Sequence, residues 1–219
     1  MKHTNTINLS RWLRGSFAVA GVVCTLGLSA CSSIVDSSTP AKSVESDVST
    51  YYLKLEDSGN KYYYSIKQPA VDKLTMIMHG GYESKTYNNA EAYDCMWVYQ
   101  QSNKQQEWYF AVSPAVAFDL GSDTYWSDTS VWVDLQSPLS DTAHWNFNYY
   151  GDKIAARVTA YGVSAKIGNK TYNDVIQVRY TGAENAGVKW FARGIGEIFE
   201  STSHPYGSTE LSLDSCYVK

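Results

Sequence analysis

The chain has 219 residues, with 18 Lys or Arg against 22 Asp or Glu, and a formal net charge of −4 at pH 7. The first thirty residues hold three cationic residues (Lys2, Arg11 and Arg14) and no acidic one, so the rest of the chain carries 15 − 22 = −7. This acidic balance argues against nucleic acid as a partner.

Residues 1–30 have the pattern of a secretory signal. The three cationic residues precede the uncharged apolar run GSFAVAGVVCTLGL, which ends in small residues. The run has fourteen residues, fewer than the roughly twenty that a transmembrane helix needs. We therefore expect it to direct export and then to be removed.

The signal ends in Leu28-Ser29-Ala30-Cys31, which resembles the lipobox of bacterial lipoproteins. In that family the cysteine thiol is acylated, the peptide is cut before the cysteine, and the new N-terminus receives a further acyl chain such as palmitate. The resemblance implies a mature N-terminus at Cys31 that is anchored to a membrane by lipid, since several chains on one residue make a stable anchor. Ser32 follows, and lipoproteins with serine there usually travel to the outer membrane, on the periplasmic route.

The next residues, 31–49, are mostly small or polar and bury too little apolar surface to become ordered, so they predict a flexible tether. Residues 50–219 are then expected to form one domain of ordinary size.

Two-residue alternation recurs through that domain and indicates half-buried strands. Apolar residues alternate with polar ones in KYYYSI, KLTMIM, EWYFAV, IAARVTAY and TYNDVIQVRY, and turn formers such as Asp57-Ser58-Gly59-Asn60 and Gly168-Asn169 separate the runs. Helical spacing is not sustained for three turns anywhere in the domain. We predict an all-β fold, a single antiparallel domain of about ten strands, as a curved sheet, half-barrel or sandwich.

Four cysteines occur in the chain. Cys24 leaves with the signal and Cys31 is the lipidation site, so Cys95 and Cys216 remain in the domain. Exported domains meet oxidising conditions, and a leftover pair there is more often a disulfide than a metal or redox site. We predict a Cys95–Cys216 disulfide.

The C-terminal half resembles a β-sheet domain found in uncharacterised bacterial secreted proteins and lipoproteins. The resemblance runs from Pro138-Leu139 through Trp145 and IGNKTYNDVIQV to KWFARGIGEI, about 65 residues. Arg193 stands where that family usually has proline or lysine. The resemblance implies a β-sheet module and brings no activity with it.

Gly194 and Gly196 follow Trp190 in KWFARGIGEI. Val188, Trp190, Ala192 and both glycines share one face of the predicted strand, so the glycines leave a gap beside the indole. An aromatic ring from a neighbouring strand could fill it, or the glycines could permit a bend or bulge; the functional alternative is close approach of a ligand. We expect Trp145, Trp190, Gly194 and Gly196 to be structural.

No motif for catalysis or metal binding is present. His79-Gly80-Gly81 resembles the oxyanion loop of lipases and esterases, but the chain has no G-x-S-x-G nucleophile elbow. The tripeptide is therefore most simply a hairpin turn. His144 and His204 stand alone, and Asp119, Asp123 and Asp128 lack the ligand spacing of a calcium loop. We expect no catalytic residue, no metal and no cofactor.

Three functional classes remain open. The first, which we favour, is a non-enzymatic envelope lipoprotein that binds a partner protein or supports an assembly. The second is a carrier of a lipid or other hydrophobic ligand in a β cavity. The third is a carbohydrate-binding module, suggested by the aromatic content, for which Trp126 and Trp132 are the candidates for exposed stacking surfaces.

Overall fold

The structure is a computed structural model that describes residues 43–219 except 57, 69–71, 123–125, 128–129, 206 and 219, with the backbone alone at 68 and 81–84. A short 3-10 helix, η1 (Val48–Tyr51), precedes twelve strands. The strands are β1 (Lys61–Gln68), β2 (Asp72–Tyr87), β3 (Ala90–Tyr99), β4 (Lys104–Val112), β5 (Val116–Gly121), β6 (Trp132–Gln136), β7 (His144–Tyr149), β8 (Asp152–Ile167), β9 (Lys170–Thr181), β10 (Ala186–Ala192), β11 (Gly196–His204) and β12 (Gly207–Tyr217).

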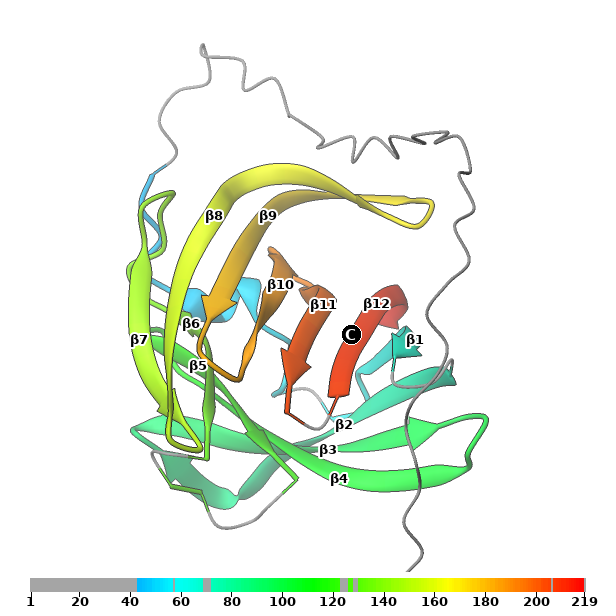
Figure 1. The fold of residues 1–219 in the computed structure, drawn as a ribbon. Helices are drawn as coiled ribbons and strands as arrows, with labels where there is room; N and C mark the ends of the chain where they lie inside the picture. The colour runs from blue at the N-terminus through cyan, green and yellow to red at the C-terminus, as the bar shows by residue number, and fades with distance from the viewer. Residues whose placement is uncertain are drawn as a thin grey trace, which may run out of the picture. The chain divides into compact units, whose positions relative to one another are not determined.

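All twelve strands belong to one antiparallel sheet in the order β6-β5-β4-β3-β2-β1-β12-β11-β10-β9-β8-β7. The sheet curls until its end strands, β6 and β7, lie beside each other without ladder hydrogen bonds, so it forms a nearly closed barrel (Figure 1). The predicted all-β antiparallel fold is confirmed. The strands are longer than expected, because β2 and β8 each have 16 residues.

Side-chain packing joins β6 to β7 where backbone pairing is missing. The Trp132 ring on β6 contacts Phe147 and Tyr149 on β7, with centroids 5.2 and 5.1 Å apart. Trp145 on β7 donates its Nε1–H to the Val133 carbonyl oxygen on β6 at 3.4 Å. This aromatic seam covers the two edges that an open sheet would expose.

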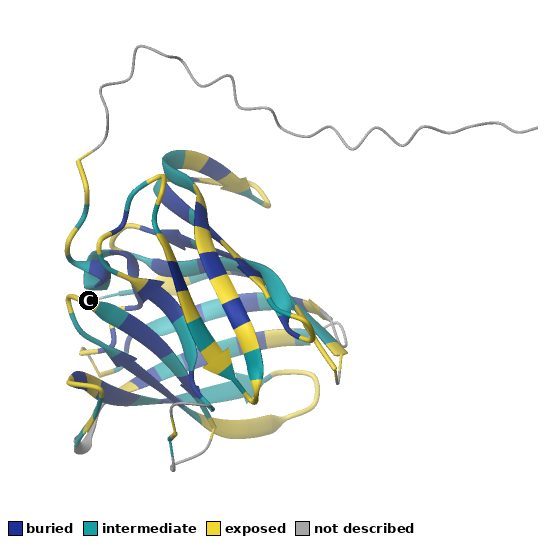
Figure 2. Ribbon diagram, turned by 60° about the vertical axis from the view of Figure 1, so that its left-hand side comes forward, coloured by how far each residue is buried: buried dark blue, intermediate teal, exposed yellow. Residues whose placement is uncertain are grey.

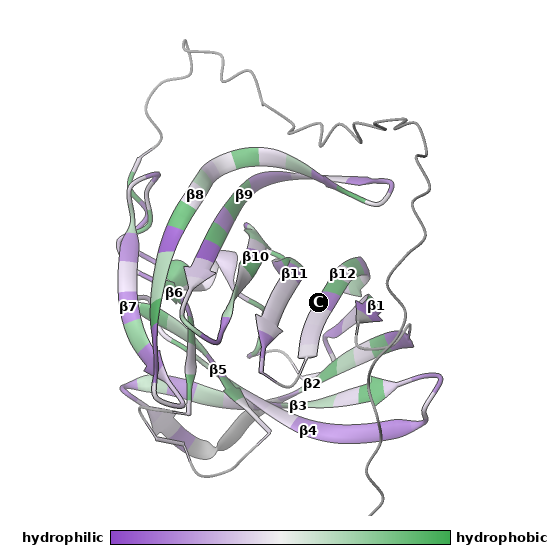
Figure 3. Cartoon of the chain, viewed as in Figure 1, coloured by the Kyte–Doolittle hydropathy of each residue, from purple (hydrophilic) through white to green (hydrophobic). Residues whose placement is uncertain are grey.

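Alternation along the strands directs one side chain in two into the barrel interior, which we call the lumen. Along β8, Ile154, Ala156 and Val158 are buried while Ala155 and Arg157 are exposed, and Figure 2 shows such banding on the strands that face the viewer. Across β3, β4 and β5, side chains of the outer face are also buried, including Ala92, Ala111 and Phe118, in a second apolar cluster. By contrast, the first half of β4 is exposed and hydrophilic (Figure 3).

The segment before β1 enters the barrel. We call residues 43–55 the plug, because Val48, Tyr51, Tyr52 and Leu55 in it are at most 1% exposed. Glu45 forms an isolated antiparallel bridge with Leu139. Residues 43–49 thus pack against the domain, although their polar composition predicted a tether.

Gly80 lies within β2 and not in a hairpin turn. It has φ +110°, at a break in register where Met78 faces Cys95 and Gly80 faces Asp94. The hairpin predicted at His79-Gly80-Gly81 is therefore wrong, and the glycine serves a β-bulge inside one long strand.

Candidate functional site

The lumen holds a buried lysine surrounded by carboxylates, which we call the lumen cluster: Lys189, Asp134, Glu197, Glu200 and Asp119. The Lys189 Nζ atom lies 2.9 Å from Asp134 Oδ1, 3.3 Å from Glu197 Oε2 and 3.7 Å from Glu200 Oε2. The lysine side chain is 3% exposed and that of Asp134 is 1% exposed. Groups of this kind are buried only when they are paired, and here one cation serves several anions.

A β-bulge brings the two glutamates to the same cation. Lys189 on β10 faces Glu200 on β11, and Phe191 faces Glu197, with a break in register between the two pairs. Residues three apart on a regular strand point to opposite faces. The extra residue in the bulge changes that parity, so Glu197 and Glu200 both reach Lys189.

Further hydrogen bonds hold the aspartates in place. Tyr52 of the plug donates its hydroxyl to Asp134 Oδ2 at 2.7 Å. Asp119 on β5 accepts from Trp108 Nε1 at 2.7 Å and from the Gly121 backbone at 2.9 Å, both at Oδ1. The plug and four strands thus meet at one polar cluster inside an apolar barrel.

Burial dominates the ionisation of the acids. It raises the pKa of Asp119 to about 6, against the attraction of Lys189. It also raises the pKa of Asp134 and of Glu197 above their usual values, where Lys189 again opposes it. The pKa of Lys189 is raised as well, because the attraction of the carboxylates outweighs the burial that disfavours its charge. Lys189 therefore stays cationic, and Asp119, Asp134 and Glu197 retain protons more readily than free acids do.

The cavity beside the cluster is small. Its volume is about 20 Å³, and Tyr52, Tyr64, Trp97 and Phe110 help to line it. One water needs roughly 10–15 Å³ of such volume. Carboxyl groups with raised pKa can serve general acid catalysis, but this cavity has room for a water molecule and not for a substrate. Among the residues that the structure describes, no group of three or more His, Cys, Asp or Glu is arranged to hold a metal ion.

Arg193 fastens the plug to the barrel. Its guanidinium bonds Glu45 Oε2 at 2.9 Å, Asp174 Oδ2 at 2.6 Å and the Tyr51 hydroxyl at 2.9 Å, and it lies 4.4 Å from the centre of the Tyr51 ring. The adjacent Gly194 backbone donates to the Thr50 carbonyl oxygen at 2.7 Å. The turn between β10 and β11 thus binds the plug, and a planar guanidinium suits these several partners.

The structure places the predicted structural residues differently from the sequence analysis. Gly194, with φ +72°, lies in the β10–β11 turn, and a Cβ there would meet nothing within 4 Å. Gly196 has φ +106°, and a Cβ there would lie 2.8 Å from the Leu53 backbone nitrogen. The expected gap beside Trp190 is therefore wrong: one glycine makes the turn and the other lets the plug approach.

Trp190 is half-buried and pairs with Phe199 at 5.1 Å, while its neighbours Lys189 and Phe191 are the residues that face the lumen. The face of β10 that carries Trp190 therefore lies outside the lumen. Trp145 is 5% exposed and belongs to the seam.

The predicted disulfide is not formed. Cys95 on β3 and Cys216 on β12 are both free, the first buried and the second exposed. Two strands, β2 and β1, separate β3 from β12 in the sheet. Neighbouring strands lie about 4.8 Å apart, so the two residues are about 14 Å apart, whereas a disulfide needs Cα atoms within about 7 Å.

The remaining predicted residues give no second site. Cys31, Asp123 and Asp128 lie outside the described residues. His79 lies 3.1 Å from Asp94 Oδ2, across the β2–β3 ladder. Trp126 packs against Tyr87 and Tyr109, and Trp132 belongs to the seam, so neither is a free stacking surface.

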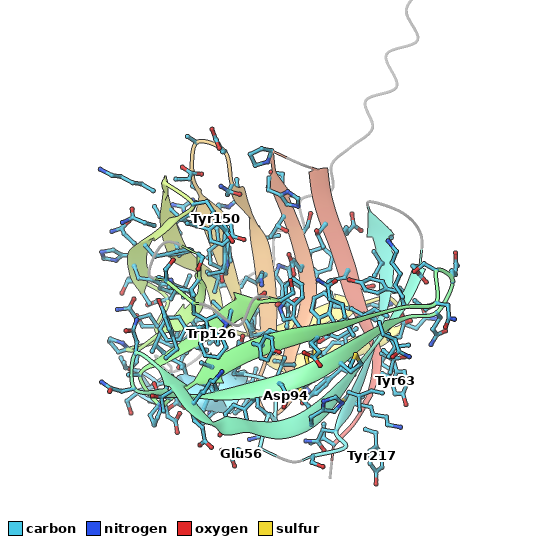
Figure 4. The ribbon with its side chains drawn as sticks, turned by 90° about the horizontal axis from the view of Figure 1, so that it is seen from below. Glu56, Tyr63, Asp94, Trp126, Tyr150 and Tyr217 are labelled. Atoms are coloured by element: carbon cyan, nitrogen blue, oxygen red, sulfur yellow. The ribbon has the colours of Figure 1, made fainter. Side chains whose placement is uncertain are left out.

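The largest exposed aromatic side chains among the described residues are those of Tyr150, 71% exposed, and Tyr217, 57% exposed. Figure 4 shows them on opposite sides of the barrel, Tyr150 near one edge of the view and Tyr217 with Tyr63 near the other. They form no continuous aromatic strip of the kind that would stack on a sugar chain.

Sequence reasoning missed Lys189, Asp134, Glu197, Glu200 and the role of Asp119. The available signal was a charged residue among apolar and aromatic residues in VKWFA. That signal does not tell which face of the strand is inside, and the bulge that aligns the glutamates leaves no trace in the spacing.

The described residues contain no helix that is long and apolar enough to cross a membrane. No protein-family model matches the chain, and no curated protein matches it. Among solved structures, a "putative lipoprotein" from Parabacteroides distasonis is similar with TM-score 0.37 and 8% identity, over 77% of this chain and 98% of that one. A "putative exported protein with YmcC-like fold" from Bacteroides fragilis is similar with TM-score 0.44 and 8% identity, over 77% of this chain and 100% of that one. Both likenesses are remote and neither states an activity.

Proposed function

We propose that this protein is an exported lipoprotein, anchored to the outer membrane of a bacterial envelope through acylated Cys31, whose barrel is a non-enzymatic binding or structural module. The signal pattern and Leu28-Ser29-Ala30-Cys31 support the export and the anchor. One observation carries the rest: the lumen is filled by the chain's own side chains, and Lys189 finds its counter-charges there. A partner then meets the outer surface and the loops.

The filled lumen also weighs against the carrier. A cavity of about 20 Å³ has space for one water and not for an acyl chain. The separation of Tyr150 from Tyr217 likewise weighs against a carbohydrate-binding strip. We propose that the protein has no catalytic activity for the same reason, since the carboxyl groups suited to acid–base chemistry have no space for a substrate beside them.

Fatty-acid labelling tests the anchor. In cells that express the full chain, label should enter the wild-type protein and be absent from Cys31→Ala, which should persist as uncleaved precursor. Cys216→Ala is the matched control, because it removes an exposed thiol of the domain and should keep the label. Label on Cys31→Ala would contradict the proposal.

Density-gradient fractionation tests the destination. The wild-type protein should sediment with the outer membrane, and Ser32→Asp should remain in the inner membrane if the residue after Cys31 directs sorting as it does in other lipoproteins. Equal distribution of both proteins would contradict the outer-membrane assignment while leaving the anchor intact.

A further inference from the structure

A row of basic residues crosses the outer face of β7, β8 and β9. His144 pairs with Arg157 across the β7–β8 ladder, and Arg157 pairs with Arg179 across the β8–β9 ladder. All three residues are exposed. Directly opposed side chains in an antiparallel sheet have Cβ atoms about 4.5–5.5 Å apart, and like charges in that position are destabilising.

Two other exposed cations of the sheet are matched with acids. Lys67 on β1 pairs with Glu210 on β12 at 2.6 Å, and Lys73 on β2 pairs with Asp214 at 2.5 Å. Across the part of the chain that the structure describes, neither Arg157 nor Arg179 forms an ion pair with any carboxylate. Two opposed guanidiniums without a counter-charge are unexpected on a protein with an excess of acidic residues.

A hollow adjoins this row. Its volume is about 320 Å³, and its lining includes His144, Asn146, Ala155, Arg157 and Thr181. Ala155 stands opposite Asn146 in one ladder and opposite Thr181 in the other, so a small side chain separates two longer polar ones. The His144 ring is held by an Nδ1–H bond to the Thr142 carbonyl oxygen at 3.2 Å, which leaves Nε2 for another partner. The hollow therefore presents polar groups of several kinds around an unfilled space.

We propose that this row and hollow bind a phosphate group, carried either by a small soluble molecule or by a lipid headgroup. Guanidinium pairs with phosphate through two parallel N–H···O bonds. A phosphate monoester carries about −1.5 to −2 charge at pH 7, which balances two arginines, whereas one carboxylate would leave a positive charge. The amide of Asn146 and the hydroxyl of Thr181 can hold the rest of the molecule. The site deepens the proposed binding function and rests on it.

The test is a thermal melt of the full chain in neutral detergent, titrated with inorganic phosphate at constant ionic strength set by chloride. A ligand that binds only the folded state raises the Tm with saturation. We expect a saturable rise for the wild type, and no rise for Arg157→Gln or Arg179→Gln. Lys166→Gln is the matched control: it removes one exposed cation from the same strand and should respond as the wild type does.

Without phosphate, Arg157→Gln should melt at a higher temperature than the wild type, because it removes the repulsion across β8 and β9. A variant that had merely lost fold integrity would melt lower. The proposal is overturned if the wild type shows no saturable response, or if Lys166→Gln loses as much of it as Arg157→Gln does.

Vesicles of phosphatidylcholine with and without phosphatidic acid distinguish the two sources, because the N-terminal anchor of the full chain binds both kinds of vesicle. Additional co-sedimentation with the phosphatidic acid vesicles that requires Arg157 assigns the phosphate to a lipid headgroup; response to free phosphate without that additional binding assigns it to a soluble molecule. Failure of fatty-acid labelling would overturn the anchor alone, and failure of the phosphate response would overturn this site alone.

Discussion

At the scale of single residues, burial outweighs the attraction of Lys189 in setting the pKa of Asp119, Asp134 and Glu197. Asp119 illustrates this, because it keeps two hydrogen bonds to Oδ1 and lies near Lys189, and yet burial raises its pKa to about 6. A free aspartate has a pKa near 3.9. Between these two values the folded protein holds a proton that the unfolded chain has lost.

Asp119→Asn should therefore change the pH dependence of stability. In the wild type, a raised pKa in the folded state means that the contribution of Asp119 to stability falls as pH rises from about 4 to about 6. Asparagine can still accept the bonds from Trp108 and Gly121 and does not titrate. We expect the difference in unfolding free energy, wild type minus variant, to decrease across this interval in urea melts.

Asp72→Asn is a control for this measurement, because hydrogen bonds to its carboxylate lower its pKa. The difference should therefore rise with pH, mainly below about pH 4, and stay nearly constant where Asp119 titrates. A constant difference between the wild type and Asp119→Asn from pH 4 to 7 would contradict the assignment of a raised pKa to Asp119.

At the scale of elements, the plug accounts for features of the C-terminal half that the sequence analysis assigned to packing within the strand. Arg193, Gly194 and Gly196 lie in and beside the β10–β11 turn, and each contacts the plug. Arg193 does so through its charged side chain, Gly194 through its backbone N–H, and Gly196 through a Cα that carries no Cβ. The run RGIG is thus one half of an interface, and its partner is the segment 43–55.

Gly196→Ala should be more damaging than Gly194→Ala. Both positions have positive φ, for which a non-glycine residue pays roughly 1–2 kcal/mol. At Gly196 the added methyl would also lie 2.8–2.9 Å from Leu53 backbone atoms, and overpacking typically costs about 1–3 kcal/mol more. Urea unfolding of the two variants measures the difference directly. Equal losses of unfolding free energy in the two variants would contradict this prediction, because they would show that Leu53 moves aside without cost.

Alternation predicted the inward residues of β1, β2, β8 and β9, since in these strands one face is apolar and the other polar. It failed for β10, where VKWFA offers apolar residues on both faces. The interior face there is set by where Asp134 and the bulged β11 place their carboxylates. Such a choice depends on contacts between strands distant in sequence, which spacing within one strand does not encode.

The plug was missed for a related reason. Val48 is apolar, but the residues around it are mostly small or polar, so composition assigned residues 31–49 to a tether and began the domain at residue 50, just before Tyr51 and Tyr52. Tyr51 and Tyr52 are held in place by hydrogen bonds to residues far along the chain, namely Asp134, Asp174 and Arg193.

At the scale of the whole molecule, strand order decides what the two cysteines can do. The predicted pairing assumed that two leftover thiols of an exported domain meet, and the sheet places two strands between them. The fold is held instead by a continuous ladder that runs from β6 around the barrel to β7, and by the seam that joins these two end strands.

Alkylation should therefore separate the two thiols. Iodoacetamide added to the folded protein should modify Cys216, which is exposed, whereas Cys95 is buried and should react only after denaturation. Burial raises the pKa of the Cys95 thiol, which further disfavours the reactive thiolate. Peptide mapping by mass spectrometry identifies the modified residue, and added reductant should leave the Tm unchanged. A peptide linked through Cys95 and Cys216 would contradict the strand order.

The position of the plug has a mechanical consequence. The chain that leads from Cys31 reaches the domain at the plug, so tension applied from that side acts on Glu45, η1 and Tyr52 before it reaches β1. The bridge between Glu45 and Leu139 and the bonds of Arg193 resist it together. β1 lies in the middle of the sheet, between β2 and β12. A force applied from the N-terminal side would thus have to extract Tyr52 from the barrel before it could separate a strand from the sheet. The domain should therefore resist such a force better than it would if the force acted directly on an edge strand.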